Sequence, residues 1–124
     1  MVMDKAQGLH SFWSSFGLPA YDENTVPDDA LMPYITYSVA TDSLDYVVPL
    51  SASVWYKSTS WEAVSKKVDA ISEYIGNGGV VLPMQVGYLY ISRGNPFAQR
   101  IADESNSSIR RIYINVNCEY LTDK

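Results

Sequence analysis

Residues 59–76 read TSWEAVSKKVDAISEYIG, and this stretch decides the fold because it separates two groups of alternating segments. Its apolar residues recur at steps of three and four, which places them on one face of a helix. Thr59 and Glu62 match a capping box, whose side chains bond the free N–H groups of the first turn. Residues 76–79, Gly-Asn-Gly-Gly, end the helix. We expect this stripe to lie across a sheet: Trp61, Val64, Val68, Ile71 and Ile75.

Segments on both sides of this helix alternate between apolar and polar residues, which is typical of strands with one buried face. The first two should pair as an antiparallel hairpin, with a polar turn at 41–46. Pro83 places its short segment at a sheet edge or at a strand end. The expected strands are residues 33–40, 47–56, 80–84, 86–93 and 109–121. The last of them has an apolar face of Ile112, Ile114, Val116, Cys118 and Tyr120.

The remaining segments predict one short helix and several loops. Residues 4–16 place Leu9, Phe12 and Trp13 on one helical face, with Asp4 as a candidate cap. Residues 19–33 hold three prolines and several carboxylates, so we expect a solvated connector. Gly94-Asn95-Pro96 should break the preceding strand, residues 97–102 suit a helical turn, and residues 103–108 suit a polar loop.

The order of these elements is helix, two strands, helix, three strands. Strands grouped around a single central helix are typical of the α+β class with a mainly antiparallel sheet. The prediction is one domain, residues 1–124, in which about five strands pack against an N-terminal and a central helix. A chain of 124 residues and 13.9 kDa is long enough to form one core without a disulfide or metal.

The composition excludes several classes of protein and of site. Nine basic and fourteen acidic residues give a net charge of −5 and a pI near 4.6, which argues against a general nucleic-acid coat. One cysteine rules out an internal disulfide framework and a cysteine-cluster zinc site. We expect a soluble intracellular protein, because no segment is apolar enough to span a membrane and the N-terminus does not read as a signal peptide.

The residues that could carry catalysis are few. His10 is the single histidine, so we expect a structural or surface role, and Cys118 should be a buried, inert thiol. A Cys–His dyad of these two stays open. Hydrolase and phosphate-loop motifs are missing, and the acidic connector fits no EF-hand. The expectation is no enzyme, no cofactor and no metal site.

Basic and acidic residues are unevenly spread along the chain. Four arginines lie in the last third, whereas carboxylates crowd the first half. Subunits could therefore pair head to side, for example through Arg111 and Asp28. A mixed, solvated surface is the equal alternative. The four arginines are Arg93, Arg100, Arg110 and Arg111.

Several short strings, taken in order, resemble small neck proteins of long-tailed bacteriophages. The likeness runs from about Leu9 to Leu121 and is nearest to the tail terminator, or tail completion, family of siphophages. No string is a chemical signature, and the specificity lies in their number and order. The strings are FWSSFG at 12–17, PAYDENTVP at 19–27, PYITY at 33–37, WYKS at 55–58, SW at 60–61, PFAQR at 96–100 and RRIY at 110–113.

The resemblance implies a structural protein of the virion neck, assembled in the host cytoplasm. Such a subunit forms a homo-oligomeric ring, expected as a hexamer, that caps the tail tube protein and offers a joining surface to the head–tail connector. DNA would pass through the ring without sequence-specific binding, and neither membrane nor cofactor is implied. The segments matching the ring-building loops are Tyr21–Asp29 and Asn95–Ser108.

Two alternatives remain beside the terminator. Another neck component, a head-completion or connector protein, shares its size and build. A small enzyme or ligand-binding module would instead use Tyr88, Tyr90 and the acidic connector around a pocket. For the ring, aromatic and arginine residues are the expected interface candidates, because both are enriched at interfaces. They are Trp55, Tyr88, Tyr90, Phe97, Arg100, Arg110 and Arg111.

Overall fold

The computed structural model describes residues 5–39, 47–84, 87–102 and 105–121. Its helices are α1 (Lys5–Ser14) and α2 (Glu62–Ile75). Its strands are β1 (Ala20–Asp22), β2 (Tyr34–Tyr37), β3 (Val47–Lys57), β4 (Val80–Pro83), β5 (Tyr88–Ala102) and β6 (Ile109–Leu121). The candidate cap Asp4, the turn at 41–46 and residues 103–104 of the polar loop lie outside the described residues.

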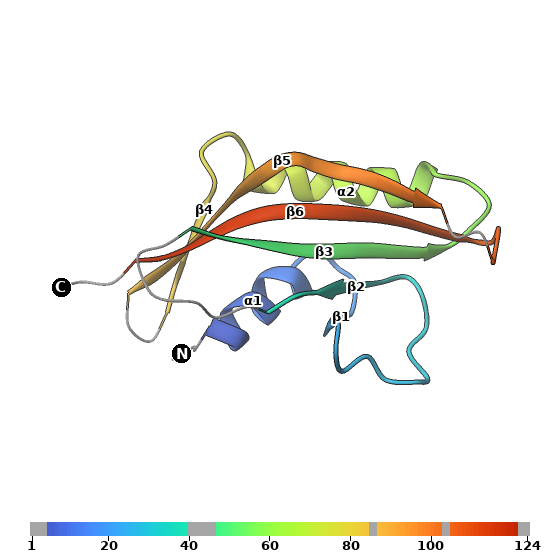
Figure 1. Cartoon of the computed structure of the whole chain (residues 1–124), viewed down its shortest axis with the longest axis horizontal. Helices are drawn as coiled ribbons and strands as arrows, with labels where there is room; N and C mark the ends of the chain where they lie inside the picture. Colours follow the sequence, from blue (N-terminus) through green and yellow to red (C-terminus); the bar gives the residue numbers. More distant parts are fainter. Residues whose placement is uncertain (1–4, 40–46, 85–86, 103–104, 122–124) are drawn as a thin grey trace.

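The six strands form one sheet in the order β1-β2-β3-β6-β5-β4 (Figure 1). The predicted α+β class is confirmed, and all strand pairs are antiparallel except β1 with β2. The hairpin of β2 and β3 is present as expected. Strand β4 lies at the sheet edge. Pro83 suits this position because proline has no backbone N–H that would need a partner.

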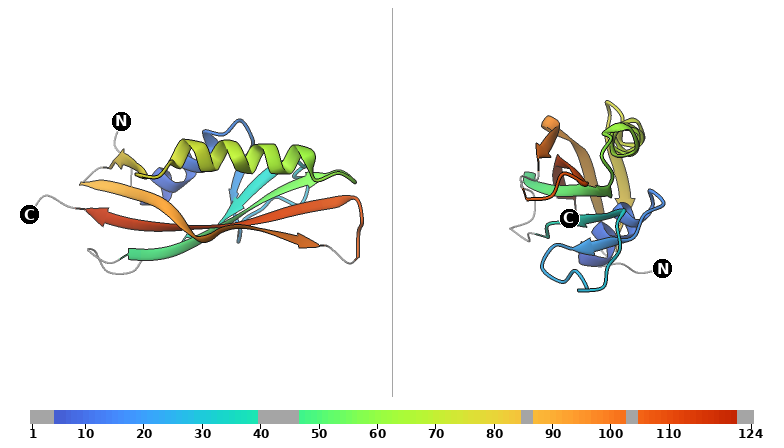
Figure 2. Two further views of the ribbon diagram at one scale, coloured as in Figure 1. Left: turned by 90° about the horizontal axis from the view of Figure 1, so that it is seen from above. Right: turned by 90° about the vertical axis from the view of Figure 1, so that its right-hand side faces the viewer.

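Both helices cover the same face of the sheet, as the two views of Figure 2 show. Helix α2 packs on β3, β5 and β6, whereas α1 packs on β1 and β2. The predicted stripe of α2 is buried at Val64, Val68, Ile71 and Ile75. The largest fully buried side chain is Trp13 of α1. The other face carries no helix, and we call it the open face.

Two predicted features of the second half are wrong. Strand β5 continues to Ala102, so Gly94-Asn95-Pro96 does not end it and no helical turn forms at 97–102. The pairing register with β6 instead shifts between Arg93 and Ala98. A side chain at Gly94 would lie 2.8 Å from the carbonyl oxygen of Asn115, so glycine permits the close strand approach at this bulge.

The N-terminus of α2 also differs from the prediction. The N-cap residue is Trp61, which makes no capping hydrogen bond, so the capping box of Thr59 and Glu62 does not form. The backbone N–H of Glu62 donates instead to Ser60 Oγ at 3.1 Å. The Glu62 carboxylate lies 3.1 Å from Lys66 Nζ, an exposed ion pair between residues four positions apart on the helix.

A further difference is β1, which forms inside the segment expected to be a connector. Its three residues run parallel to β2, with Ala20 opposite Ile35. Ala20 is buried, and the N–H of Ile35 donates to the carbonyl of Pro19 at 2.8 Å. Three residues are too few for alternation to reveal a strand, so only the pairing with β2 shows it.

Candidate interaction surfaces

The open face is centred on Trp55 of β3 and Arg111 of β6, which lie opposite each other in the register. The guanidinium carbon of Arg111 lies 4.6 Å from the centre of the Trp55 ring and 5.7 Å from that of Tyr113. Arg111 Nε donates to Ser53 Oγ at 2.9 Å, and Ser53 is only 3% exposed. The arginine is thus held over the indole ring.

Aromatic side chains continue from Trp55 across the neighbouring strands. Tyr34 of β2 lies 6.4 Å from Trp55 between ring centres, and Tyr21 of β1 meets Tyr34 edge-on at 5.7 Å. Trp55 Nε1 donates to Thr36 Oγ1 at 2.9 Å, which orients the indole. We call Tyr21, Tyr34, Trp55, Arg111 and Tyr113 the aromatic row.

A second cluster lies on the helix-covered side, where α2 begins. The guanidinium carbons of Arg100 and Arg110 lie 4.9 and 5.2 Å from the centre of the same Trp61 ring. Arg110 also donates to the backbone carbonyls of Thr59 and Ser107, each at 2.8 Å, while its Nε is buried without a partner. We call Trp61, Arg100 and Arg110 the Trp61 cluster.

A hollow of about 180 Å³ lies beside Arg100, between α2 and β5. Val68, Ala98 and Ile112 provide its apolar wall, and Ser65, Asp69 and Gln99 complete the lining. No carboxylate of the described residues lies within ion-pair distance of Arg100 or Arg110. The hollow therefore combines an apolar wall with charged lining residues of both signs, Arg100 and Asp69.

Tyr88 and Tyr90 lie at the other end of the open face, where β5 begins. Tyr88 is 45% exposed, beside the exposed Leu121 of β6. The Tyr90 hydroxyl donates to the carbonyl of Gly78 at 2.7 Å. Phe97, in contrast, is half-buried and packs against the core. The seven predicted interface residues thus lie in three separate places, Trp55 with Arg111, Arg100 with Arg110, and Tyr88 with Tyr90, while Phe97 packs in part against the core.

The segment between β1 and β2 is built from two turns. The N–H of Thr25 donates to the carbonyl of Asp22 at 2.9 Å, and that of Ala30 donates to the carbonyl of Pro27 at 3.1 Å. The second turn carries Asp28 and Asp29 at its two central positions, and both are exposed. Leu31 follows and is 82% exposed. We call residues 23–31 the acidic loop.

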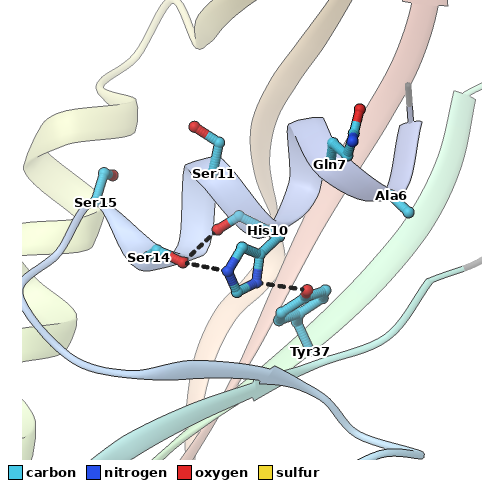
Figure 3. A pocket seen from close by; sticks show the side chains of 7 residues that line it. All are labelled: Ala6, Gln7, His10, Ser11, Ser14, Ser15 and Tyr37. Atoms are coloured by element: carbon cyan, nitrogen blue, oxygen red, sulfur yellow. Dashed lines mark hydrogen bonds between the residues drawn. The ribbon is translucent and has the colours of Figure 1, made fainter. Parts of the chain in front are cut away.

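A hollow of about 750 Å³ lies along α1 (Figure 3). His10 Nδ1 shares a hydrogen bond of 3.1 Å with the Tyr37 hydroxyl, which joins α1 to β2. The Ser14 hydroxyl lies 3.3 Å from His10 Nε2 and donates to the His10 carbonyl at 2.6 Å. The hydroxyl hydrogen of Ser14 is therefore used in a hydrogen bond to the helix backbone. These contacts agree with the structural role expected of His10.

Cys118 is fully buried on the helix-covered face of β6. Burial raises the pKa of its thiol to about 12, so at neutral pH it is a protonated core residue. His10 is exposed on α1 and contacts Tyr37 and Ser14, not Cys118. The described residues contain no group of three candidate metal ligands and no helix long and apolar enough to cross a membrane.

Three residues of these surfaces were not among the interface residues predicted from sequence. Trp61 was assigned to the core stripe of α2, although its ring also carries two arginines. Tyr113 alternates with Arg111, a pattern that could have revealed it once the open face was known. Leu31 lies between Ala30 and Met32, so no local pattern distinguished it as an exposed residue.

Comparison of the chain with protein-family models, with curated proteins and with solved structures gives no match.

Proposed function

We propose that this protein is a structural assembly protein, a phage tail terminator whose copies form a homo-oligomeric ring. The ring, proposed as a hexamer, caps the tail tube, ends its polymerisation and offers a joining surface to the head–tail connector. DNA passes through it without sequence-specific contacts. The subunit acts by binding other proteins, so its function resides in its surfaces.

One observation carries this proposal: strings that share the phage likeness converge in space although they are distant in sequence. Trp55 of the WYKS string stacks on Arg111 of the RRIY string. Trp61 of the SW string carries both Arg100 of PFAQR and Arg110 of RRIY. Tryptophan and arginine are the residue types that most often dominate binding energy at interfaces. Their convergence supports a shared interaction function for these strings.

The arrangement of helices and sheet supports the same proposal. Both helices lie on one face, so the aromatic row on the other face has no cover within the described part of the subunit. The arginine of the row is already oriented by Ser53, and the indole by Thr36. Side chains that are ordered before binding lose less conformational entropy on association.

Native mass provides the test. Light scattering would be measured on the protein alone and with purified tail tubes, and both samples would be viewed by electron microscopy. We expect closed rings, or tubes newly capped at one end. A strict monomer that leaves tubes uncapped but binds heads would overturn the terminator assignment and indicate a head-side neck protein.

A protein that ignored both tubes and heads would overturn the assembly function altogether. The ligand-binding alternative would then be tested by melting, because a ligand at 100 times its dissociation constant adds about 2.7 kcal/mol. Tyr88 and Tyr90 lie at the start of β5, at the opposite end of the molecule from the acidic loop between β1 and β2 (Figure 1). A shared pocket of these groups is therefore not formed.

A further inference from the structure

We propose that the acidic loop of one subunit docks on the Trp61 cluster of a second copy, with Leu31 seated in the hollow between α2 and β5. This inference rests on the proposed ring and names the contact that closes it. Three features carry it: complementary charge, an exposed apolar side chain that matches an apolar hollow, and the relative position of the two surfaces.

Charge complementarity comes first. Arg100 and Arg110 both lie within about 5 Å of one indole ring, so two positive charges are held close together. Among the described residues they have no carboxylate partner. The acidic loop presents Asp28 and Asp29 side by side at the centre of a turn. Opposite charges arranged in this way favour and orient association.

The apolar match adds specificity. Leu31 follows the two aspartates after one residue, Ala30, and is 82% exposed, the highest value among the large exposed apolar residues described. The hollow of about 180 Å³ lies directly beside Arg100 and has a wall of Val68, Ala98 and Ile112. A branched aliphatic side chain fits such a space, and burying it removes apolar surface from water. The order aspartate, aspartate, alanine, leucine thus places two carboxylates and one apolar side chain against Arg100 and Arg110 and the apolar wall, with Asp69 as the one carboxylate in the lining of the hollow.

The positions of the two surfaces explain why the partner is a second copy and why the contact is not made within one subunit. The acidic loop joins β1 and β2 at one edge of the sheet. Arg100 lies in β5 beyond Ile91, the last residue paired with β4, so it occupies the other edge. Seen from the end of the molecule, the loop and α2 lie on opposite sides (right panel of Figure 2).

Both surfaces nevertheless lie toward the same end of the long axis, where β3 ends and β6 begins (Figure 1). A contact between two different patches is heterologous, and it builds either a closed ring or an open filament. Patches at the same level along the long axis favour a closed ring about a rotation axis parallel to it, because successive subunits then need little translation along that axis. The contact therefore suits a ring in which all subunits face the same way.

Two variants with one defect each provide a sharp test. The loop variant, Asp28→Asn with Asp29→Asn and Leu31→Asn, loses the charges and the apolar side chain but keeps its Trp61 cluster. The cluster variant, Arg100→Glu, keeps its acidic loop. Each alone should lose the ring at concentrations where the native chain forms it. Mixed, they retain one productive contact and should form a 1:1 heterodimer that grows no further.

Matched controls keep the result specific. Glu73→Gln removes a carboxylate from the exposed side of α2, and Lys57→Glu reverses a charge at the end of β3, both outside the proposed contact. Both controls should form rings like the native chain. Circular dichroism and thermal melting of every variant establish that the changes, all at exposed positions, leave the fold intact.

The outcomes separate this inference from the proposed function. If the loop variant or the cluster variant folds and still forms rings, the proposed contact is wrong, whereas the ring function remains. Loss of rings in both variants without a heterodimer in the mixture would also overturn it, because a heterologous contact requires the pair. A native chain that forms no ring, alone or with tail tubes, would overturn both proposals.

Discussion

Cys118 and Tyr120 show how burial controls the chemistry of single residues in this protein. They alternate on the buried face of β6, and burial raises the pKa of each side chain to about 12. For Tyr120, the nearby Cys118 raises the pKa further when it is ionised. A thiol that stays protonated is a poor nucleophile.

The first prediction concerns the reactivity of this thiol. Iodoacetamide at pH 8 should label Cys118 in the native protein at least about a hundred times more slowly than in urea-unfolded chain, because the thiol is buried and protonated. Mass spectrometry of timed samples measures the two rates. Rapid labelling of native protein would revive a reactive cysteine.

The same pKa values predict how stability depends on pH. From the ordinary thiol value of 9.0 up to about 12, the unfolded chain loses protons that the folded chain keeps. The unfolded state then binds fewer protons, so the free energy of unfolding falls as the pH rises through this window. One thiol contributes a slope of at most about 1.4 kcal/mol per pH unit.

Urea unfolding at a series of pH values between about 8 and 11 measures this slope. Cys118→Ala removes the thiol, so its slope should be shallower than that of the native chain over the same range. A native stability that stays level or rises toward alkaline pH would contradict the prediction.

Arg111 illustrates a residue whose shape matters as much as its charge. Its guanidinium lies on the Trp55 ring and bonds Ser53, a geometry that an ammonium group does not reproduce. Arg111→Lys should lower the free energy of unfolding by about 0.5–1.5 kcal/mol. Urea denaturation measures the change, with Lys57→Arg, an exchange of the same two residue types at an exposed position, as the control. Equal losses in both variants would argue against the stacking.

At the scale of elements, the turn between α2 and β4 depends on one particular glycine. Gly79 has a φ of 79°, and a side chain there would lie 2.7 Å from the carbonyl oxygen of Ile91. It would also lie 2.8 Å from a ring carbon of Tyr90. Gly78, its neighbour, has open space around it. The two glycines therefore have different roles in one turn.

Alanine substitution should separate these roles. Gly79→Ala combines backbone strain with a clash against strand β5, so we expect a loss of about 1–3 kcal/mol in the free energy of unfolding. Gly78→Ala should change it by less than about 0.5 kcal/mol. Urea unfolding of the two variants side by side tests this. Similar losses for both would contradict the assigned geometry.

The elements also show how far local patterns reach. The stripe of α2 and the alternation of β6 were predicted from sequence and are confirmed, because each repeats over more than ten residues. Strand β5 was predicted to end at residue 93, because Gly94 and Pro96 are residue types that usually interrupt a strand. The bulge opposite β6 accommodates both residues, and Asn115 donates to the Pro96 carbonyl at 3.1 Å.

At the scale of the whole molecule, the proposed contact between copies predicts a dependence on salt. Charges on Asp28, Asp29 and Arg100 lie at the surface, where salt screens them. The screening length falls from about 10 Å at 0.1 M to about 3 Å at 1 M salt. We expect the association constant of the ring to fall at least about tenfold over this range.

Sedimentation velocity at several sodium chloride concentrations measures this change. The loop variant provides the comparison, because its residual association should respond less to salt. An association that strengthens with salt would instead indicate that apolar contacts dominate the ring.

The site was less predictable from sequence than the fold. Arginine and aromatic enrichment pointed to Trp55, Arg100, Arg110 and Arg111, which the structure places in two clusters. This enrichment could not show that Trp61 contacts both Arg100 and Arg110, because the two arginines are about 40 to 50 positions from Trp61 in the chain. It also could not separate Arg110 from Arg111, which are adjacent yet lie on opposite faces of the sheet.

The amino-acid sequence by itself therefore determined the helical stripe of α2, the buried face of β6 and the α+β class. Periodicity between near neighbours along the chain is sufficient for these features. Only the tertiary structure decided the strand order, the continuation of β5 and the two arginine–tryptophan clusters. Those features depend on which distant segment lies alongside, and pairing register and packing between strands, not local periodicity, determine that.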